Sequence, residues 1–178
     1  MIGAVLDVNS VKHSRLSTMN APTTLPVLQK GSQGAAVKEL QTLLNKHFGV
    51  PSIGGPIVVD GIFGQVTEAR VKTAQYRYLL KMDGIVGNLT WKALKANSAL
   101  TATKPTLRRG STGSEVEVVQ KLLKESGYYK SVVDQIFGQN TENAVKAFQR
   151  DRKLTADGIV GVKTWQEYEK LATYLTFD

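Results

Sequence analysis

One block of sequence occurs twice in this chain and constrains its fold more than any other feature. The block is Asp-Gly-Ile-Val-Gly followed at fixed spacing by Thr-Trp, over residues 83–91 and again over 157–165. An Asp-Gly pair favours a tight turn, because glycine accepts positive φ and the aspartate side chain bonds to nearby backbone. The two residues between the glycines are too few for a strand, so we interpret them as an apolar plug that fastens the turn to a core.

The duplication extends over most of the chain. The stretch 31–44 recurs with a shift of 79 residues, and the stretch 60–91 recurs with a shift of 74 residues. The first copy therefore carries five extra residues (79 − 74), which fall in the Gly/Pro-rich run 49–56. Loops accept such insertions at small entropic cost. A period of about 75 residues suits two small domains better than a solenoid.

Apolar residues at helical spacing predict an all-α fold of two tandem three-helix bundles. The six helices are expected near residues 33–46, 65–80, 88–97, 112–126, 139–153 and 162–173. In the second of them, Val66, Ala69, Val71 and Ala74 are expected to face inward. Domains this small are marginally stable, so buried aromatic residues matter to each.

The repeat also predicts the division of the chain. We expect a flexible tail over 1–24, a first domain over 25–97, a small-residue linker over 98–106 and a second domain over 107–178. The apolar run 2–6 is shorter than the roughly 7–15 residues of a secretory signal, so no signal peptide is expected. No run approaches the roughly 18 apolar residues of a membrane span.

The composition narrows the partners. The chain has no cysteine, which excludes a disulfide scaffold and a thiolate metal site. Its formal net charge is +8, which favours an anionic partner, although a solvated basic surface is the plainer interpretation. Lysines and arginines are scattered along the chain and do not form a stripe on one helix, so nucleic-acid binding is not expected.

Three separated blocks of the second copy carry a resemblance to a known family. They are Gly110-Ser111 with Val116 and Leu122-Leu123; Asp134 with Ile136-Phe137-Gly138, Thr141, Ala144-Val145 and Phe148-Gln149; and Asp157-Gly158-Ile159-Val160-Gly161 with Thr164-Trp165. In this order they resemble the peptidoglycan-binding domain 1 family, and the first copy matches nearly as far. The resemblance implies a compact three-helix module that accompanies bacterial and phage wall hydrolases. It also implies peptidoglycan, glycan and peptide stem, as the partner, and a place in the cell envelope or outside the cell.

The first copy departs from the second at two positions that matter for packing. Ala74 stands where the second copy has Phe148, so the first core either loses an aromatic residue or fills the gap from the inserted loop. In the second copy, Gln135 stands where the first has Gly61, so that turn must form without glycine.

Residues able to carry catalysis or hold a metal are few. Asp60, Asp83, Asp134 and Asp157 form potential acid–base pairs, but each occupies a turn-forming position, and we favour the turn role. Trp91 and Trp165 are potential sugar-stacking residues, but helical neighbours favour core packing. His13 and His47 alone make a poor zinc site. We therefore expect no cofactor, no metal and no enzymatic activity.

The ligand-binding candidates lie at helix ends and glycine turns. We prefer a groove beside the turns Phe63-Gly64 and Phe137-Gly138, floored by Val86 and Val160, where glycine lets a ligand approach the backbone.

Further candidates are residues that offer an aromatic face or a cation. Of the pair Tyr128-Tyr129, at least one side chain is expected to face solvent and stack on a sugar or peptide. The basic candidates are Arg77 in the first copy and Arg150 and Arg152 in the second, and Tyr76 beside Arg77 is a further candidate. These cations either complement the helix C-terminus or pair with stem carboxylates.

We interpret the chain as a non-catalytic binder of peptidoglycan through two modules. Two alternatives remain open at this point: the targeting part of a wall hydrolase whose catalytic domain lies elsewhere, and a protein-interaction scaffold.

Overall fold

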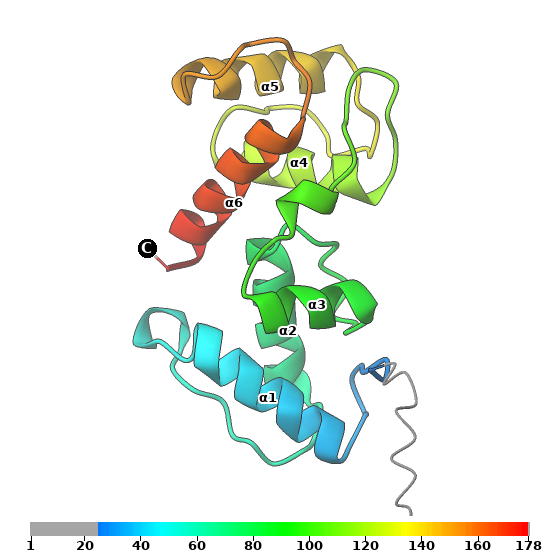
Figure 1. Cartoon of the computed structure of the whole chain (residues 1–178), viewed down its shortest axis with the longest axis vertical. Helices are drawn as coiled ribbons and strands as arrows, with labels where there is room; N and C mark the ends of the chain where they lie inside the picture. Colours follow the sequence, from blue (N-terminus) through cyan, green and yellow to red (C-terminus); the bar gives the residue numbers. More distant parts are fainter. Residues whose placement is uncertain (1–24, 178) are drawn as a thin grey trace, which may run out of the picture.

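The computed structural model describes residues 25–177, which form six α-helices and two short 3-10 helices (Figure 1). The α-helices are α1 (Ala35–Phe48), α2 (Gln65–Arg77), α3 (Asn88–Ala96), α4 (Ser114–Glu125), α5 (Gln139–Asp151) and α6 (Val162–Phe177), and the 3-10 helices are η1 (Pro51–Ile53) and η2 (Thr101–Thr103). Helices α1–α3 form a first module and α4–α6 a second, so the predicted all-α tandem fold is confirmed. The predicted tail 1–24, with His13, lies outside the described residues.

Each module is built on one amphipathic first helix. In α1, the side chains of Val37, Leu40, Leu44 and Phe48 recur every three or four residues and are fully buried. This spacing places them on one face of a helix, which packs against the other two helices of the module. Helix α4 repeats the pattern in the second module.

The two tryptophans tie the start of each module to its third helix. Trp91 and Trp165 are fully buried, as predicted, and each indole donates a hydrogen bond to a backbone carbonyl. The acceptors are Pro26 and Pro105, each 2.8 Å from the indole nitrogen. Because a buried indole N–H needs a partner, these bonds fix both packing and chain path.

Four turns of one design hold the helices together. In each, the side-chain amide of a buried glutamine donates a hydrogen bond to an aspartate carboxylate. The side-chain carbonyl of the same glutamine accepts a hydrogen bond from the backbone N–H of the residue that follows the aspartate. The pairs are Gln41–Asp60, Gln75–Asp83, Gln120–Asp134 and Gln149–Asp157, with Nε2–Oδ1 distances of 2.8, 2.9, 2.8 and 2.9 Å. The same carboxylate oxygen accepts the N–H two residues further on, so the predicted turn role of the aspartates is confirmed.

The inward face of α2 differs from the prediction. Val71 and Ala74 are buried, but Val66 and Ala69 are exposed. Arg70 occupies the inward position instead, because its guanidinium donates to the backbone carbonyls of Phe48, at the end of α1, and of Gly55 in the inserted run. A basic residue is therefore buried to hold a loop.

The first core contains aromatic residues at positions where the second has none, an arrangement that neither prediction for Ala74 included. Phe48 and Tyr78 are both buried and meet edge to face with their ring centroids 5.7 Å apart. The second copy has Gly127 and Arg152 at the matching positions. The aromatic residues of this part of the first core therefore come from the ends of α1 and α2 and not from the inserted loop.

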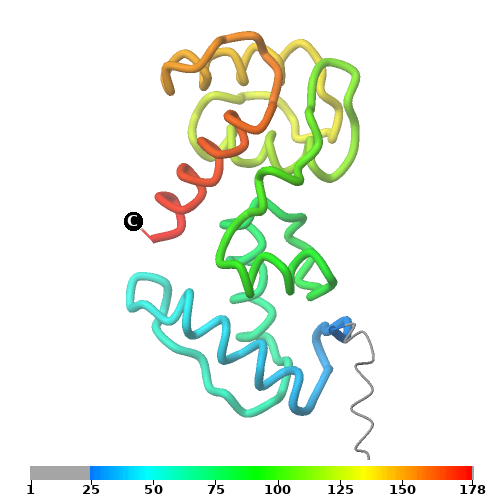
Figure 2. Tube along the Cα trace, viewed as in Figure 1, coloured from blue at the N-terminus to red at the C-terminus, as the bar shows by residue number. Residues whose placement is uncertain are grey.

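The modules pack against each other. The segment predicted as a linker contains η2, its Ala99 is buried, and the Ala99 N–H donates to Glu169 of α6 at 2.7 Å. Helix α6 runs four residues beyond its predicted end and returns toward the first module (Figure 2). There, Phe177 stacks on Phe48 with ring centroids 6.1 Å apart, and the guanidinium of Arg77 lies 5.2 Å from the Phe177 ring.

Candidate functional site

The same cleft occurs once in each module. Cleft A lies between the end of α2 and the start of α3, and cleft B lies between the end of α5 and the start of α6. Ten equivalent positions line both clefts, and six of them carry the same residue: Gln75, Leu80, Asp83, Ile85, Gly87 and Thr90 in cleft A, and Gln149, Leu154, Asp157, Ile159, Gly161 and Thr164 in cleft B. Recurrence at equivalent positions of a duplicated chain makes the pair our candidate site.

Both clefts border the N-terminus of a helix. In α3, the residue before the helix is Gly87, which offers no side-chain cap to the amides of the first turn. First-turn amides have no partner within the helix, and the helix dipole favours negative charge beside them. Gly161 occupies the same place before α6. The arrangement suits a carboxylate or an acetamido carbonyl.

The two clefts carry different charges. Cleft B is lined by two lysines, Lys153 and Lys163, and one carboxylate, Asp157. Cleft A is lined by Lys81 and Lys104 together with Asp83 and Glu115. The excess of positive charge in cleft B and the balance in cleft A predict different ligand preferences.

Lys104 is the most constrained of these side chains. Its ammonium donates a hydrogen bond to the carbonyl of Leu79 and lies 5.3 Å from the centre of the Trp165 ring. Burial lowers the pKa of Lys104 to about 8, while the carboxylates of Glu115 and Glu169 act in the opposite direction. Lys104 therefore connects the linker, the end of α2 and the second core.

Both clefts include a residue in the left-handed region. Leu79 has φ 55° and Lys153 has φ 58°, and they occupy equivalent positions after α2 and α5. The amides of Leu80 and Leu154 return to the carbonyls of Gln75 and Gln149 at 2.8 Å, which ends each helix sharply. The termination turns the chain so that the cleft opens beside it.

The side chains predicted to line the preferred groove are buried in the structure. Phe63, Phe137, Val86 and Val160 are at most 1% exposed, so their side chains belong to the cores and have no surface for a ligand. Val86 and Val160 act as the predicted plugs, bridging to the starts of their modules through Leu28 and Leu107.

The two glycines predicted for that groove stand immediately before helices. Gly64 and Gly138 precede α2 and α5 and do not line clefts A or B. Their φ values of −89° are open to other residues, and a Cβ at either would meet nothing within 4 Å. Close backbone approach therefore gives no reason for glycine there.

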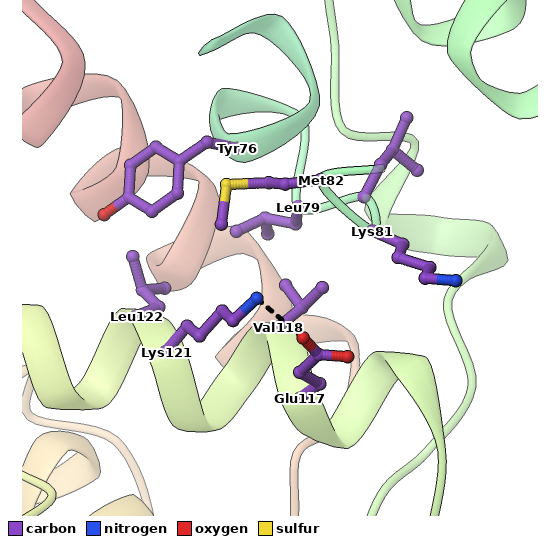
Figure 3. Close-up of a pocket in the computed structure, with 9 residues that line it drawn as sticks. Tyr76, Leu79, Lys81, Met82, Glu117, Val118, Lys121 and Leu122 are labelled. Carbon is purple, nitrogen blue, oxygen red and sulfur yellow. Dashed lines mark ion pairs between the residues drawn. The ribbon is translucent and has the colours of Figure 1, made fainter. Parts of the chain in front are cut away.

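Two of the predicted candidates lie at the contact between the modules. Tyr76 faces α4 beside Met82, with Val118 and Leu122 opposite (Figure 3). Arg77 lies over the aromatic cluster of Phe48, Tyr78 and Phe177 and donates to Asn97 at 2.8 Å. Burial and the carboxylate of Glu125 raise the pKa of the Tyr76 hydroxyl. Both side chains are thus used by the interface.

The remaining candidates gather at the end of α5. Tyr129 is buried and donates to the carbonyl of residue 132, whereas Tyr128 is half-buried and donates to Asp151 at 2.8 Å. Arg150 is exposed, and Arg152 lies 5.3 Å from the Phe148 ring. Ligand binding by Tyr128 and the two arginines stays a prediction.

Two of the turn aspartates, Asp60 and Asp134, are stabilised in their charged form. Hydrogen bonds from Gln41 and Gln120, and then from the turn amides, lower the pKa values of Asp60 and Asp134. Within residues 25–177, no three side chains of His, Asp or Glu cluster as metal ligands would. No helix in the same part of the chain is long and apolar enough to cross a membrane.

Comparison with known proteins identifies the class. The family model described as "Putative peptidoglycan binding domain" matches residues 33–94 and 112–167, which is more than half of the chain. The chain belongs to this peptidoglycan-binding domain family, twice over.

Two of the relatives are named as amidases. A "Probable N-acetylmuramoyl-L-alanine amidase" of Bacillus licheniformis is 35% identical over 92% of this chain and 50% of its own length. The "N-acetylmuramoyl-L-alanine amidase CwlM" of Mycobacterium tuberculosis is 32% identical over 77% of this chain and 36% of its own. A crystal structure of the SleB N-terminal domain is 36% identical, with a TM-score of 0.39, and covers 39% of this chain and 96% of that one. The chain spans about half or less of the length of these two amidases.

Sequence reasoning missed the residues that shape the clefts. Gln75 and Gln149, which line the clefts, have a sequence signal, because each precedes an aspartate turn, but a glutamine within a helix is typical of a surface. Lys153 and Lys163 gave no signal beyond their charge. Lys104 was placed in a linker, and only the fold brings it to cleft A.

Proposed function

We propose that the chain binds peptidoglycan without cleaving it, through clefts A and B. The observation that carries this proposal is the recurrence of one cleft in both family modules, at a helix N-terminus and beside lysines. We also propose residues 25–97 and 107–178 as the limits of the modules, and the cell envelope or the exterior as the place of action.

The chemistry of the clefts matches that of a wall peptide. Stem peptides carry carboxylates, and helix amides with lysines offer hydrogen bonds and positive charge to them. Lys163 stands in the first turn of α6 and lines cleft B, where the helix dipole adds to its charge. A shallow site of this kind binds weakly, and two sites on one chain compensate by avidity.

Sedimentation with purified sacculi tests the proposal. Lys163→Glu reverses the charge of cleft B, and we expect it to reduce the bound fraction at equal protein by about three-fold or more, since each charge contact is worth up to about 1 kcal/mol. Lys92→Glu is the matched control, because Lys92 is exposed on α3 and lies outside both clefts. Equal loss in both variants would show that only net charge matters and would overturn the assignment of cleft B.

A second candidate is the targeting part of a wall hydrolase, favoured by the amidases among the relatives.

The non-catalytic proposal is supported by the turn aspartates, whose carboxylates are engaged by glutamine and backbone amides. We expect a sacculus suspension to keep its turbidity for hours in the presence of the chain. Release of soluble muropeptides above a heat-inactivated control would contradict the non-catalytic proposal.

A further inference from the structure

Cleft A is not enclosed by its own module alone. Module one contributes the end of α2, the Asp83 turn and the start of α3, while α4 of module two contributes Ser114, Glu115 and Val118. Cleft B, at the same place in module two, is lined by residues 149–164 of that module alone. The two clefts therefore have equivalent linings from their own modules, but only cleft A is also lined by the other module. We call the three α4 residues Ser114, Glu115 and Val118 the second wall of cleft A.

The second wall is held in place by contacts on three sides. Lys104 hydrogen-bonds to the Leu79 carbonyl at the rim of the cleft, and Glu169 accepts the Ala99 N–H. Further away, Phe177 stacks on Phe48. These contacts join the linker and α6 to the first module. Helix α4 itself meets that module where Val118 and Leu122 lie opposite Tyr76.

The second wall changes the charge of the site. Module one gives cleft A a cation and an anion, Lys81 and Asp83, both exposed. Module two adds Glu115, whose carboxylate accepts a hydrogen bond from the hydroxyl of Ser114 at 2.8 Å. Its charge acts to raise the pKa of Lys104. Residue 36, the counterpart of Glu115 in the first module, is alanine. The glutamate is thus a feature of the junction and not of the repeat.

We propose that cleft A is a composite site, built by both modules, for an amino-acid group that carries both a free ammonium and a carboxylate. The ammonium lies toward Glu115 and Asp83, and the carboxylate lies toward Lys81. This inference rests on the proposed function and deepens it, because a diamino acid in a stem peptide presents this pair of charges. Cleft B, with two lysines and one aspartate, takes the carboxylate without selecting for the ammonium.

The test is a titration of the whole chain with two soluble tripeptides. One probe is N-acetyl-L-alanyl-γ-D-glutamyl-L-lysine, and the other is the same peptide with its side-chain ammonium acetylated. We expect the parent to bind the free-ammonium peptide about three- to five-fold more tightly, which corresponds to one partly exposed charge pair. Glu115→Gln should reduce this preference, because Asp83 alone then remains beside the ammonium, and it should not weaken binding of the acetylated peptide.

The control is Glu167→Gln on α6, because Glu167 pairs with Lys170 and lines neither cleft. It should keep the preference. Glutamine is isosteric with glutamate, and a circular dichroism melt confirms that both variants fold. A preference of the same size in Glu115→Gln as in the parent overturns the composite site, and so does a parent that binds both peptides equally while still sedimenting with sacculi. A parent that binds neither the peptides nor sacculi overturns the proposed function itself.

Discussion

At the scale of single residues, one turn is built against the preference of its side chain. Gln135 has φ 64°, in the left-handed region, where the three equivalent turns carry Gly61, Gly84 and Gly158 at φ 77–81°. A non-glycine residue there is strained by contact between its Cβ and the following carbonyl. The strain is tolerated because the Gln135 N–H is held by Gln120 at 3.0 Å.

Replacing this residue should therefore stabilise the protein. We expect Gln135→Gly to raise the free energy of unfolding by up to about 1 kcal/mol, because the relief of strain exceeds the entropy that glycine gains on unfolding. Urea unfolding measures the difference. The reverse exchange, Gly61→Gln, should destabilise, because a Cβ there meets Lys38 carbon atoms at 3.0 Å. Loss of stability in Gln135→Gly would show that the glutamine side chain makes a contribution that exceeds the strain.

Residue types predicted local turns well and distant partners poorly. The aspartates and tryptophans were assigned correctly, because their roles follow from neighbours in sequence. Arg70 and Lys104 were not, because their acceptors are backbone carbonyls 15–25 residues away that only the folded chain brings near. The same limit applies to the candidate groove, whose predicted lining side chains are buried in the cores. Both turns of each copy share one sequence pattern, and the pattern alone does not tell which turn borders a cleft.

At the scale of elements, the helices were predictable and their ends less so. All six begin within two residues of the predicted starts, since apolar spacing and turn residues define them. Helix α6 runs on to Phe177 because its last turn packs on η1 and α2 of the first module. Nothing in the local sequence signals this contact.

The end of α6 should couple the stability of the modules. We expect Phe177→Ala to lower the melting temperature of the first module and to split or broaden a single transition, because it removes a ring stacked on Phe48 and placed beneath Arg77. Such contacts contribute about 0.5–1.5 kcal/mol beyond area burial. Calorimetry measures the effect. Tyr174→Ala on the same helix is the control, because Tyr174 is 64% exposed. Identical melts for the two variants would show that α6 does not stabilise the first module.

At the scale of the whole molecule, the tandem is a packed pair of modules. The nine residues between the modules were predicted to form a small-residue linker, and in the structure they form η2, bury Ala99 and Thr101 and bond to both modules. Fixed placement favours ligands whose spacing matches the two clefts, since little entropy is lost on joining the second site. The repeat predicted the number of modules, but the contacts between the modules could be found only in the structure.

The central claim is that wall fragments are held at clefts A and B. Amide chemical-shift mapping of the whole chain, titrated with muramidase-solubilised muropeptides, tests it most directly. We predict that the largest shifts fall on the two turns and helix starts at residues 83–90 and 157–164, and that Lys163→Glu reduces those of the second group alone. Shifts concentrated at Tyr128 and Arg152, or spread evenly over surface lysines, would contradict the claim.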